Sequence, residues 1–400
     1  MIVDFEKGKS SKRIIKKTTI SFYFTYNEQW IGGSYYIINI IRSLQYLEDN
    51  IKPNIVILSF NNSDFNSIKE LNYPFVEYIL VDRLVLPKWQ RGVNKISKIF
   101  LSSCLFKQPI LSVNEIDIIF PAPFNPRFDI IPKKVFWRPD FQESYLPHLF
   151  DKEEIFKRIA QNKRIQNEAK FVIFSSENAL SDFDKFYPNY KIKKYVFKFS
   201  SVLPDISNIS FPAVLIKYDL SNTAYFFSPN QFWQHKNHII ILRALKKMKE
   251  KGGLNFKVYF SGKEHDARNP HYFDSLKKYV LENQLEDCIR FLGFIDRNDQ
   301  LCLMKNAIGI IQPSLFEGWS TVVEDAKALN QQILVSDIAV HKEQLGEKGL
   351  YFDPFSEDSL IAQISILTTG SVIKNEFNYN DSIKKNAYHF LHIMNLVNAN

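Results

Sequence analysis

Cysteine is scarce in this chain of 400 residues, which contains only Cys104, Cys288 and Cys302. They are odd in number and far apart, so they fit neither a disulfide framework nor a metal-ligand pattern. The scarcity excludes a disulfide-rich secreted domain and predicts a protein of the reducing cytoplasm.

Long apolar runs are missing as well. Met1 to Lys17 is polar and rich in lysine, without the apolar stretch of a signal peptide. The longest apolar candidate, Ile96 to Val113, is interrupted by Lys98 and Lys107 and falls short of the ~18 to 20 uninterrupted apolar residues that a membrane span needs. We therefore expect any membrane contact to be peripheral, on the inner face of the membrane.

The chain has an excess of positive charge and many aromatic residues. Lys and Arg total 51 against 43 Asp and Glu, which gives a net charge of +8, and 15% of the residues are aromatic. This charge permits attraction to anionic lipid, nucleic acid or nucleotide without choosing among them. Because no nucleic-acid-binding motif accompanies it, we expect no nucleic-acid partner.

Strand patterns alternate with helical patterns in both halves of the chain, which predicts two doubly wound α/β domains with parallel sheets. Periodicity is lost near residues 200–221, where we place an interdomain linker. We predict an N-terminal, acceptor-side domain over residues 1–205 and a second domain over 206–380. A C-terminal helix over 381–400 is expected to pack back on the first domain. Because such sheets bind ligands at the carboxyl ends of their strands, two facing domains imply a cleft between them.

Two features of the first half have a functional and an ordinary structural interpretation. The glycine pair Gly32-Gly33 follows the first predicted strand and either lets backbone approach a ligand or only forms a tight turn. Lys88, Arg91, Lys95 and Lys98 share one face of a predicted helix, with apolar residues on the other. Such a helix suits an anionic membrane surface. More commonly, the charged face of such a helix is exposed to solvent and its apolar face packs on the protein core.

The most informative stretch is Pro313–Leu329, in which Glu317 is the acidic residue of a glycine-containing turn between a buried strand and a helix. Thr321 and Glu324 have the spacing of a capping box, so the helix is expected to begin near Ser320 or Thr321. Its first turn has unpaired N–H groups and the positive end of the helix dipole. A carboxylate beside such a helix start predicts a hydroxyl-rich, phosphorylated ligand, namely a sugar nucleotide.

Two further loops are rich in polar residues. In Ser228–His238, Lys236 lies just before a helix, where it is well placed to neutralise a diphosphate. His235 and His238 have no acidic or cysteine partner at metal-ligand spacing, so packing or capping is expected for them and no metal site. In the first domain, Arg138–Pro147 interleaves polar and aromatic side chains after a strand, which is typical of a site wall.

Two motifs, PNQFWQHKNH at 229–238 and PSLFEGWSTVVE at 313–324, carry a family resemblance. With them the chain resembles the retaining, family 4 type glycosyltransferases of the glycosyl transferases group 1 superfamily, most clearly over residues 225–354. The resemblance implies the GT-B architecture, with two Rossmann-like domains facing across a cleft. It also implies metal-independent transfer of a sugar, with retention of configuration, from a nucleotide-sugar donor to a saccharide or lipid-linked acceptor in cell-surface polysaccharide synthesis. The donor is a substrate, and no cofactor is expected.

The resemblance also implies roles for single residues. Glu317 is expected to hold hydroxyls of the donor sugar and Lys236 the diphosphate, while Asp325 is expected to hold the ribose, with Glu324 as the competing candidate. Glu343 matches an acid whose function in the family is less certain. The candidate catalytic residues are Glu317, Lys236, Asp140 and Glu143, and the remaining donor-binding candidates are Gly33, Gln231, Gly262, Gly318, Trp319, Ser320, Thr321 and Asp325.

Two positions depart from the family pattern. Gln231 stands where many relatives have an arginine as a second diphosphate cation, and Glu143 stands where a histidine near the reacting centre is common. These departures motivate an alternative function: a catalytically silent GT-B protein that binds nucleotide sugar or glycan without turnover. Another GT-B enzyme, such as a nucleotide-sugar epimerase, shares the fold but is not supported by the Glu317 turn.

Overall fold

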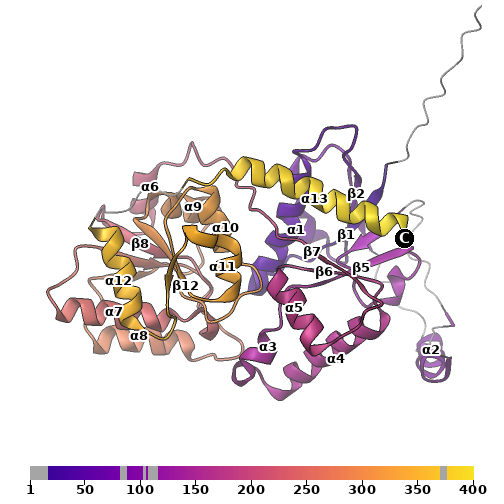
Figure 1. The fold of residues 1–400 in the computed structure, drawn as a ribbon, viewed down its shortest axis with the longest axis horizontal. Helices are drawn as coiled ribbons and strands as arrows, with labels where there is room; N and C mark the ends of the chain where they lie inside the picture. The colour runs from indigo at the N-terminus through magenta and orange to yellow at the C-terminus, as the bar shows by residue number, and fades with distance from the viewer. Residues whose placement is uncertain (1–16, 82–87, 102–104, 107–115, 370–375) are drawn as a thin grey trace, which may run out of the picture.

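The computed structural model describes residues 17–81, 88–101, 105–106, 116–369 and 376–400. They form two lobes, the first in indigo and magenta and the second mainly in orange in Figure 1, each built on one parallel sheet. The predicted pair of doubly wound α/β domains is confirmed.

The first sheet has seven strands in the order β3-β2-β1-β4-β5-β6-β7. Its central strands are buried on both faces, because α1 and the C-terminal helix α13 cover one face and α4 and α5 the other. The elements of this domain are β1 Thr19–Tyr23, α1 Ile31–Leu44, β2 Asn54–Ser59, β3 Val76–Leu80, α2 Lys88–Leu101, β4 Ile118–Phe120, β5 Lys133–Arg138, α3 Gln142–Tyr145, α4 Lys152–Glu168, β6 Phe171–Phe174, α5 Glu177–Phe186 and β7 Lys193–Val196.

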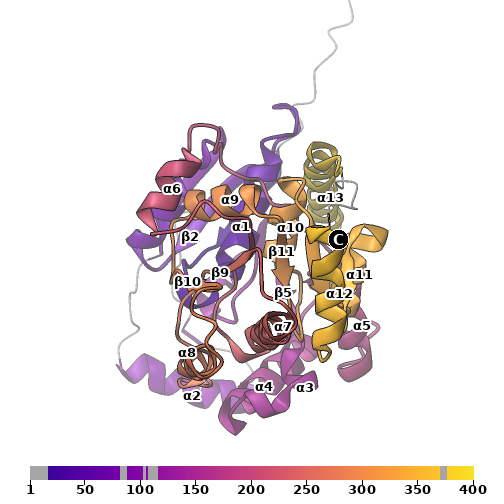
Figure 2. The same ribbon diagram turned by 90° about the vertical axis from the view of Figure 1, so that its left-hand side faces the viewer.

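The second sheet has six strands in the order β10-β9-β8-β11-β12-β13. Helices α7, α8 and α12 pack on one face and α6, α9, α10 and α11 on the other, as the end-on view of Figure 2 shows. The elements are α6 Phe211–Lys217, β8 Tyr225–Ser228, α7 His238–Glu250, β9 Lys257–Phe260, α8 Tyr272–Glu282, β10 Ile289–Phe291, α9 Arg297–Asn306, β11 Gly309–Gln312, α10 Thr321–Ala328, β12 Ile333–Ser336, α11 Ala339–Leu345, β13 Leu350–Phe352 and α12 Glu357–Thr368.

The C-terminal helix α13, Tyr379–Ala399, crosses from the second domain to the first (Figure 1). Phe390 and Met394 join the core of the first domain, and the ring centroids of Phe390 and Phe22 are 5.9 Å apart. At its other end, the hydroxyl of Tyr379 donates a hydrogen bond to Glu324 of the second domain at 2.6 Å. Helix α13 therefore packs into the core of the first domain and is hydrogen-bonded to the second.

The segment expected to be an irregular linker contains a short helix, α6. Ser210 caps it by accepting a hydrogen bond from the backbone N–H of Ala213, and Pro212 occupies its first turn, where the missing N–H costs nothing. Val214 and Leu215 are buried in the core of the second domain. Pro212 therefore marks a helix start, and residues 211–217 belong to the second domain and not to an irregular linker.

Helix α2 stands apart from the two sheets (Figure 1). It presents apolar side chains to solvent. Trp89, Ile96 and Phe100 are 61%, 59% and 79% exposed. These three apolar residues therefore do not pack on the core, as the commoner arrangement of such a helix would require. The side chains of Lys88, Arg91 and Lys98 lie outside the described residues. In the described part of the chain, no helix has the length and apolar character to cross a membrane.

Candidate active site between the two domains

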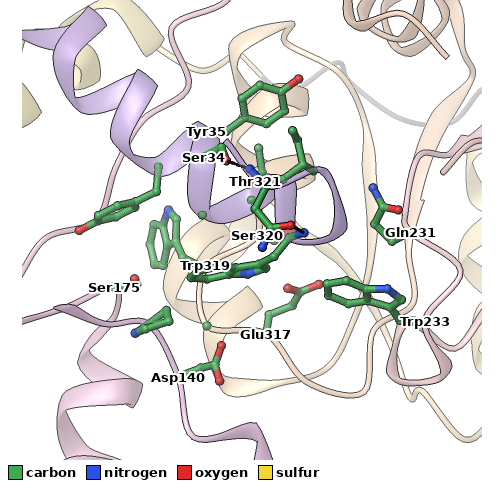
Figure 3. A pocket seen from close by; sticks show the side chains of 18 of the residues that line it. Ser34, Tyr35, Asp140, Ser175, Gln231, Trp233, Glu317, Trp319, Ser320 and Thr321 are labelled. Atoms are coloured by element: carbon green, nitrogen blue, oxygen red, sulfur yellow. Dashed lines mark hydrogen bonds between the residues drawn. The ribbon is translucent and has the colours of Figure 1, made fainter. Parts of the chain in front are cut away.

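The carboxyl ends of the two sheets face each other across a cavity of about 1100 Å³. It is lined by the loops after β1, β4 and β5 of the first domain and after β8, β9, β10 and β11 of the second. The structure brings all of the predicted site residues except Glu143 to the wall of this cavity. Figure 3 shows part of this wall, with Glu317, Trp319, Ser320 and Thr321 from the second domain and Ser34, Tyr35 and Asp140 from the first.

Glu317 is held by three donors at a single oxygen. Its Oε1 atom accepts hydrogen bonds from Lys236 Nζ at 2.6 Å and from Gln312 Nε2 and Ser314 Oγ, both at 2.7 Å. Burial by itself would raise the pKa of Glu317, but the Lys236 ammonium and the hydrogen bonds together hold this pKa below its ordinary value. Glu317 is therefore a carboxylate of fixed orientation at neutral pH.

Lys236 reaches Glu317 because the chain turns sharply after it. Residues Gln234–Lys236 form a single 3-10 turn that ends at Asn237, which has a left-handed backbone with φ of 56°. The Asn237 side chain donates a hydrogen bond to the carbonyl oxygen of Pro354, which anchors the turn. Lys236 and Glu317 form an ion pair whose side chains are 14% and 9% exposed, so the sequence motifs around them meet in space.

Helix α10 begins at Thr321 as expected, but its capping differs from the predicted box. Ser320 is the N-cap and accepts from the N–H of Val323 at 3.4 Å. Glu324 turns away from the N-cap because Lys327, Gln344 and Tyr379 all donate to its carboxylate. The capping-box role of Glu324 is thus wrong, and its buried, fully engaged carboxylate also makes it a poor ribose ligand.

Asp325, the predicted ribose ligand, has a partner that the sequence analysis did not single out. Arg297, at the start of α9, places Nη2 2.6 Å from Asp325 Oδ1. The Arg297 guanidinium lies over the ring of Tyr35 from the first domain, 4.9 Å from its centroid. All three residues line the cavity. The ion pair could have been found only from the fold, because α9 and α10 are separate elements.

Three of the predicted site residues are glycines that line the cavity. At each of them a side chain would clash with a different neighbour. A methyl group built on Gly318 would lie 2.6 Å from the carbonyl oxygen of Pro139 in the first domain, so the two domains touch there. On Gly262 it would lie 2.1 Å from the carbonyl oxygen of Asn230. On Gly33 it would lie 2.7 Å from the Trp30 ring, which occupies the space that the sequence analysis left for backbone approach to a ligand.

Glu143 is the one predicted catalytic residue that the structure withdraws from the cavity. It is 3% exposed, and its carboxylate pairs with Arg138 at 2.7 Å and with Arg158 at 3.5 Å. The placement corrects the expectation that Glu143 faces the reacting centre: two arginines draw this carboxylate into the first domain. Asp140 does line the cavity, and its Oδ1 accepts the backbone N–H of Gln142 at 3.2 Å.

Glu343 of α11 joins the two domains. Its two carboxylate oxygens accept the backbone N–H groups of Glu177 and Asn178 at the start of α5, at 2.8 and 3.3 Å, and Lys198 lies 3.0 Å away. A carboxylate at a helix start complements the helix dipole and its unpaired N–H groups. Glu343 lies outside the cavity wall and holds the second domain against the first.

Gln231 and His235 have hydrogen-bonding partners, and the ring of His238 packs against Phe232. Gln231 Oε1 accepts the backbone N–H of Lys263 at 2.9 Å. Burial lowers the pKa of His235 well below its ordinary value, with Lys236 and Arg268 adding to the effect, so this ring is neutral. No group of three or more His, Cys, Asp or Glu in the described segments is arranged to hold a metal ion.

Residues 217–390, the bulk of the second domain, match the family Glycosyl transferases group 1. The chain carries a glycosyl transferases group 1 domain. It is 29% identical over 135 residues to the O-antigen chain mannosyltransferase RfbU of Salmonella typhimurium, an alignment that covers 34% of this chain and 36% of the relative. The match therefore spans about a third of that relative's length.

Solved structures extend the comparison to both domains. The fold is similar to that of a glycosyltransferase from Rickettsia africae, with a TM-score of 0.61 at 16% identity over 96% of each chain. It is equally similar to Anabaena Alr3699/HepE in complex with UDP and glucose, with a TM-score of 0.61 at 16% identity over 96% of this chain and 97% of that one. These likenesses place the group 1 domain within a GT-B architecture.

Proposed function

We propose that the protein is a glycosyltransferase that moves a sugar from a nucleotide-sugar donor to a saccharide or lipid-linked acceptor in cell-surface polysaccharide synthesis. The observation that carries the proposal is the meeting of Glu317, Lys236 and the start of α10 in the interdomain cavity. The group 1 domain and its likeness to an O-antigen chain mannosyltransferase support it.

The three elements suit the charges that form when a nucleoside diphosphate leaves a sugar. The N–H groups in the first turn of α10 have no acceptor within the helix and attract phosphate oxygens. Lys236 supplies a positive charge beside them. When Lys236 turns toward a phosphate, Gln312 and Ser314 still hold Glu317 Oε1, so the carboxylate keeps its orientation toward the sugar hydroxyls.

Retention of configuration and independence from metal belong to the same proposal. In the proposed route the acceptor hydroxyl attacks from the face that the diphosphate leaves, so no protein nucleophile is needed. Lys236 and the α10 amides offset the leaving-group charge in place of a metal ion. Asp140, on the opposite wall, is the proposed acceptor-side carboxylate.

The test is donor turnover by purified protein with EDTA present, using GDP-mannose and UDP-glucose and measuring nucleoside diphosphate release. We expect release by the wild type, and a loss of about 30- to 1,000-fold in Lys236→Ala and Glu317→Gln, since removing such a contact costs ~2 to 4 kcal/mol of transition-state stabilisation. Lys342→Ala, a variant of an exposed lysine paired with Asp337, is the control. Unchanged turnover in either site variant would refute its assigned role.

A catalytically silent binder of nucleotide sugar or glycan is the second candidate. The observations that favour it are the withdrawal of Glu143 into ion pairs and the use of Gln231 to hold the backbone of Lys263. Isothermal titration with both donors, run beside the turnover assay, separates the two candidates. Binding without release of nucleoside diphosphate would favour the silent protein.

We also propose that α2 rests on an anionic membrane surface. Its exposed Trp89, Ile96 and Phe100 suit insertion among lipid headgroups. Flotation with liposomes containing phosphatidylglycerol tests this: wild-type protein should float, and Trp89→Ala combined with Phe100→Ala should sink. Equal flotation of the wild type and the double variant would contradict this role for α2.

A further inference from the structure

Three aromatic rings are stacked on the wall that the first domain contributes to the cavity. Trp137 of β5 stacks on Tyr36 of α1, with centroids 4.1 Å apart and planes 5° from parallel, and also on Trp30, at 5.5 Å and 17°. Trp137 Nε1 donates a hydrogen bond to Ser175 Oγ at 2.9 Å, which fixes its ring. Tyr36 is 1% exposed, so the stack is anchored in the core and runs outward to Trp30.

Trp30 is the outermost ring and remains 43% exposed while lining the cavity. It lies so close to Gly33 that a methyl group at that position would be 2.7 Å from the ring. The missing side chain at Gly33 therefore lets the indole lie against α1. A tryptophan held on one side and left open on the other, inside a concave site, suits a ligand with an apolar face.

We propose that the exposed face of Trp30 is a stacking platform for a sugar ring of the acceptor, an inference that rests on the proposed transferase function. The C–H groups on one face of a pyranose carry partial positive charge, which matches the negative π-face of an indole. The hydroxyl groups at the ring edge remain free for hydrogen bonds, for which Asp140 on the same wall offers a carboxylate.

The position of the stack favours the acceptor over the donor as its occupant. Glu317, Lys236 and the α10 start all belong to the second domain, whereas Trp30, Trp137 and Tyr36 belong to the first. The second domain has its own exposed aromatic residue at the cavity, Phe294, which is 51% exposed and follows β10. A base of the donor nucleotide has that ring within its own domain, so Trp30 is left for the acceptor.

Charge near the platform favours a neutral saccharide. The arginines that line the cavity are compensated: Arg138 pairs with Glu143, Arg158 with Glu154, Arg268 with Asp266 and Arg297 with Asp325. A carboxylate within ion-pair distance balances the positive charge of each of these arginines. Among the described residues, the platform therefore has apolar contact to offer and no uncompensated arginine for a phosphate or a uronic acid.

The test is saturation-transfer difference NMR on the full chain with methyl α-glycosides of mannose, glucose, galactose and rhamnose, in the presence of UDP or GDP. The variants are Trp30→Ala, Trp30→Phe and, as a matched control, Phe156→Ala, because Phe156 is 72% exposed on α4 and outside the cavity wall. We expect ring protons of at least one glycoside to receive saturation from the wild type and from the control. Affinity should fall about tenfold in Trp30→Ala, which corresponds to ~1.4 kcal/mol, and less in Trp30→Phe, which keeps an aromatic face.

Three results would overturn the platform: no glycoside binds the wild type, Trp30→Ala binds glycosides as the wild type does, or Trp30→Ala loses affinity for UDP and GDP in place of glycosides. The last would make the ring a platform for the base. If the wild type neither binds nor turns over a nucleotide sugar, the proposed function fails. If it turns over the donor while the Trp30 variants match the wild type in glycoside binding, only the platform fails.

Discussion

Replacing Gly318 with alanine should separate the two domains at the cavity without unfolding either of them. The added methyl group would lie 2.6 Å from the carbonyl oxygen of Pro139 and 3.0 Å from Cβ of Asp140. Both contacts belong to the other domain, and the nearer is a backbone atom that cannot rotate away. The domains must therefore move apart, and the cavity must widen between Glu317 and Asp140.

The magnitude follows from the overlap. Forcing one extra methyl group into a packed contact costs ~1 to 3 kcal/mol. Because the clash lies between the domains and each domain has its own core, this cost falls on closure of the cavity and not on folding. If turnover needs the closed cavity, kcat/KM should fall by about 5- to 150-fold, at tenfold per ~1.4 kcal/mol.

The assay is kcat/KM for donor turnover together with small-angle X-ray scattering and thermal unfolding. We expect Gly318→Ala to show lower kcat/KM and a larger radius of gyration, with a Tm within about 3 °C of the wild type. Gly92→Ala is the control, because a methyl group there meets nothing within 4 Å. A variant with wild-type kcat/KM and wild-type scattering would refute the reasoning that this contact controls the cavity.

Two further predictions concern residues outside the proposed chemistry. Glu343→Ala removes the carboxylate that accepts two N–H groups of α5 across the domain interface, a loss of ~1 to 3 kcal/mol, and should enlarge the radius of gyration. Asp337→Asn is its control, and equal scattering of both would count against an interdomain role. Burial, followed by Lys236, lowers the pKa of His238 to about 3. The unfolded chain, with a His pKa of about 6.5, therefore binds this proton first, so stability is full above pH ~6.5 and falls as the pH drops toward 3. The unfolding free energy, measured by urea titration, should fall by ~1.4 kcal/mol less in His238→Phe than in the wild type when the pH is lowered from 7.5 to 5.5. An equal fall in both proteins would contradict the lowered pKa of His238.

The helices and strands could largely be predicted from the sequence, because buried parallel strands appear as short apolar runs between amphipathic helices. In the second domain the apolar runs at 224–228, 256–260, 289–291, 307–311, 332–335 and 350–352 predict six strands, and each corresponds to an observed strand within two residues at each end. Helices α6 and α11 of the second domain were not predicted, and the proline and serine signals of α6 are shared by linkers and by helix starts. Local chemistry allowed both, and burial of Val214 and Leu215 decided between them.

The motifs around Lys236 and Glu317 were recognisable by themselves, because each places its residue in the loop that follows a buried strand. That placement, read from the sequence alone, determined that both would face a cavity at the carboxyl ends of the strands. Only the tertiary structure decided which side chains they and their neighbours meet: Lys236 with Glu317, Arg297 with Asp325, and Glu143 with two arginines away from the cavity. The reason is physical. A strand or helix follows from the periodicity of nearby residues, whereas the orientation of a buried charge depends on which distant groups the fold brings within a few ångströms of it.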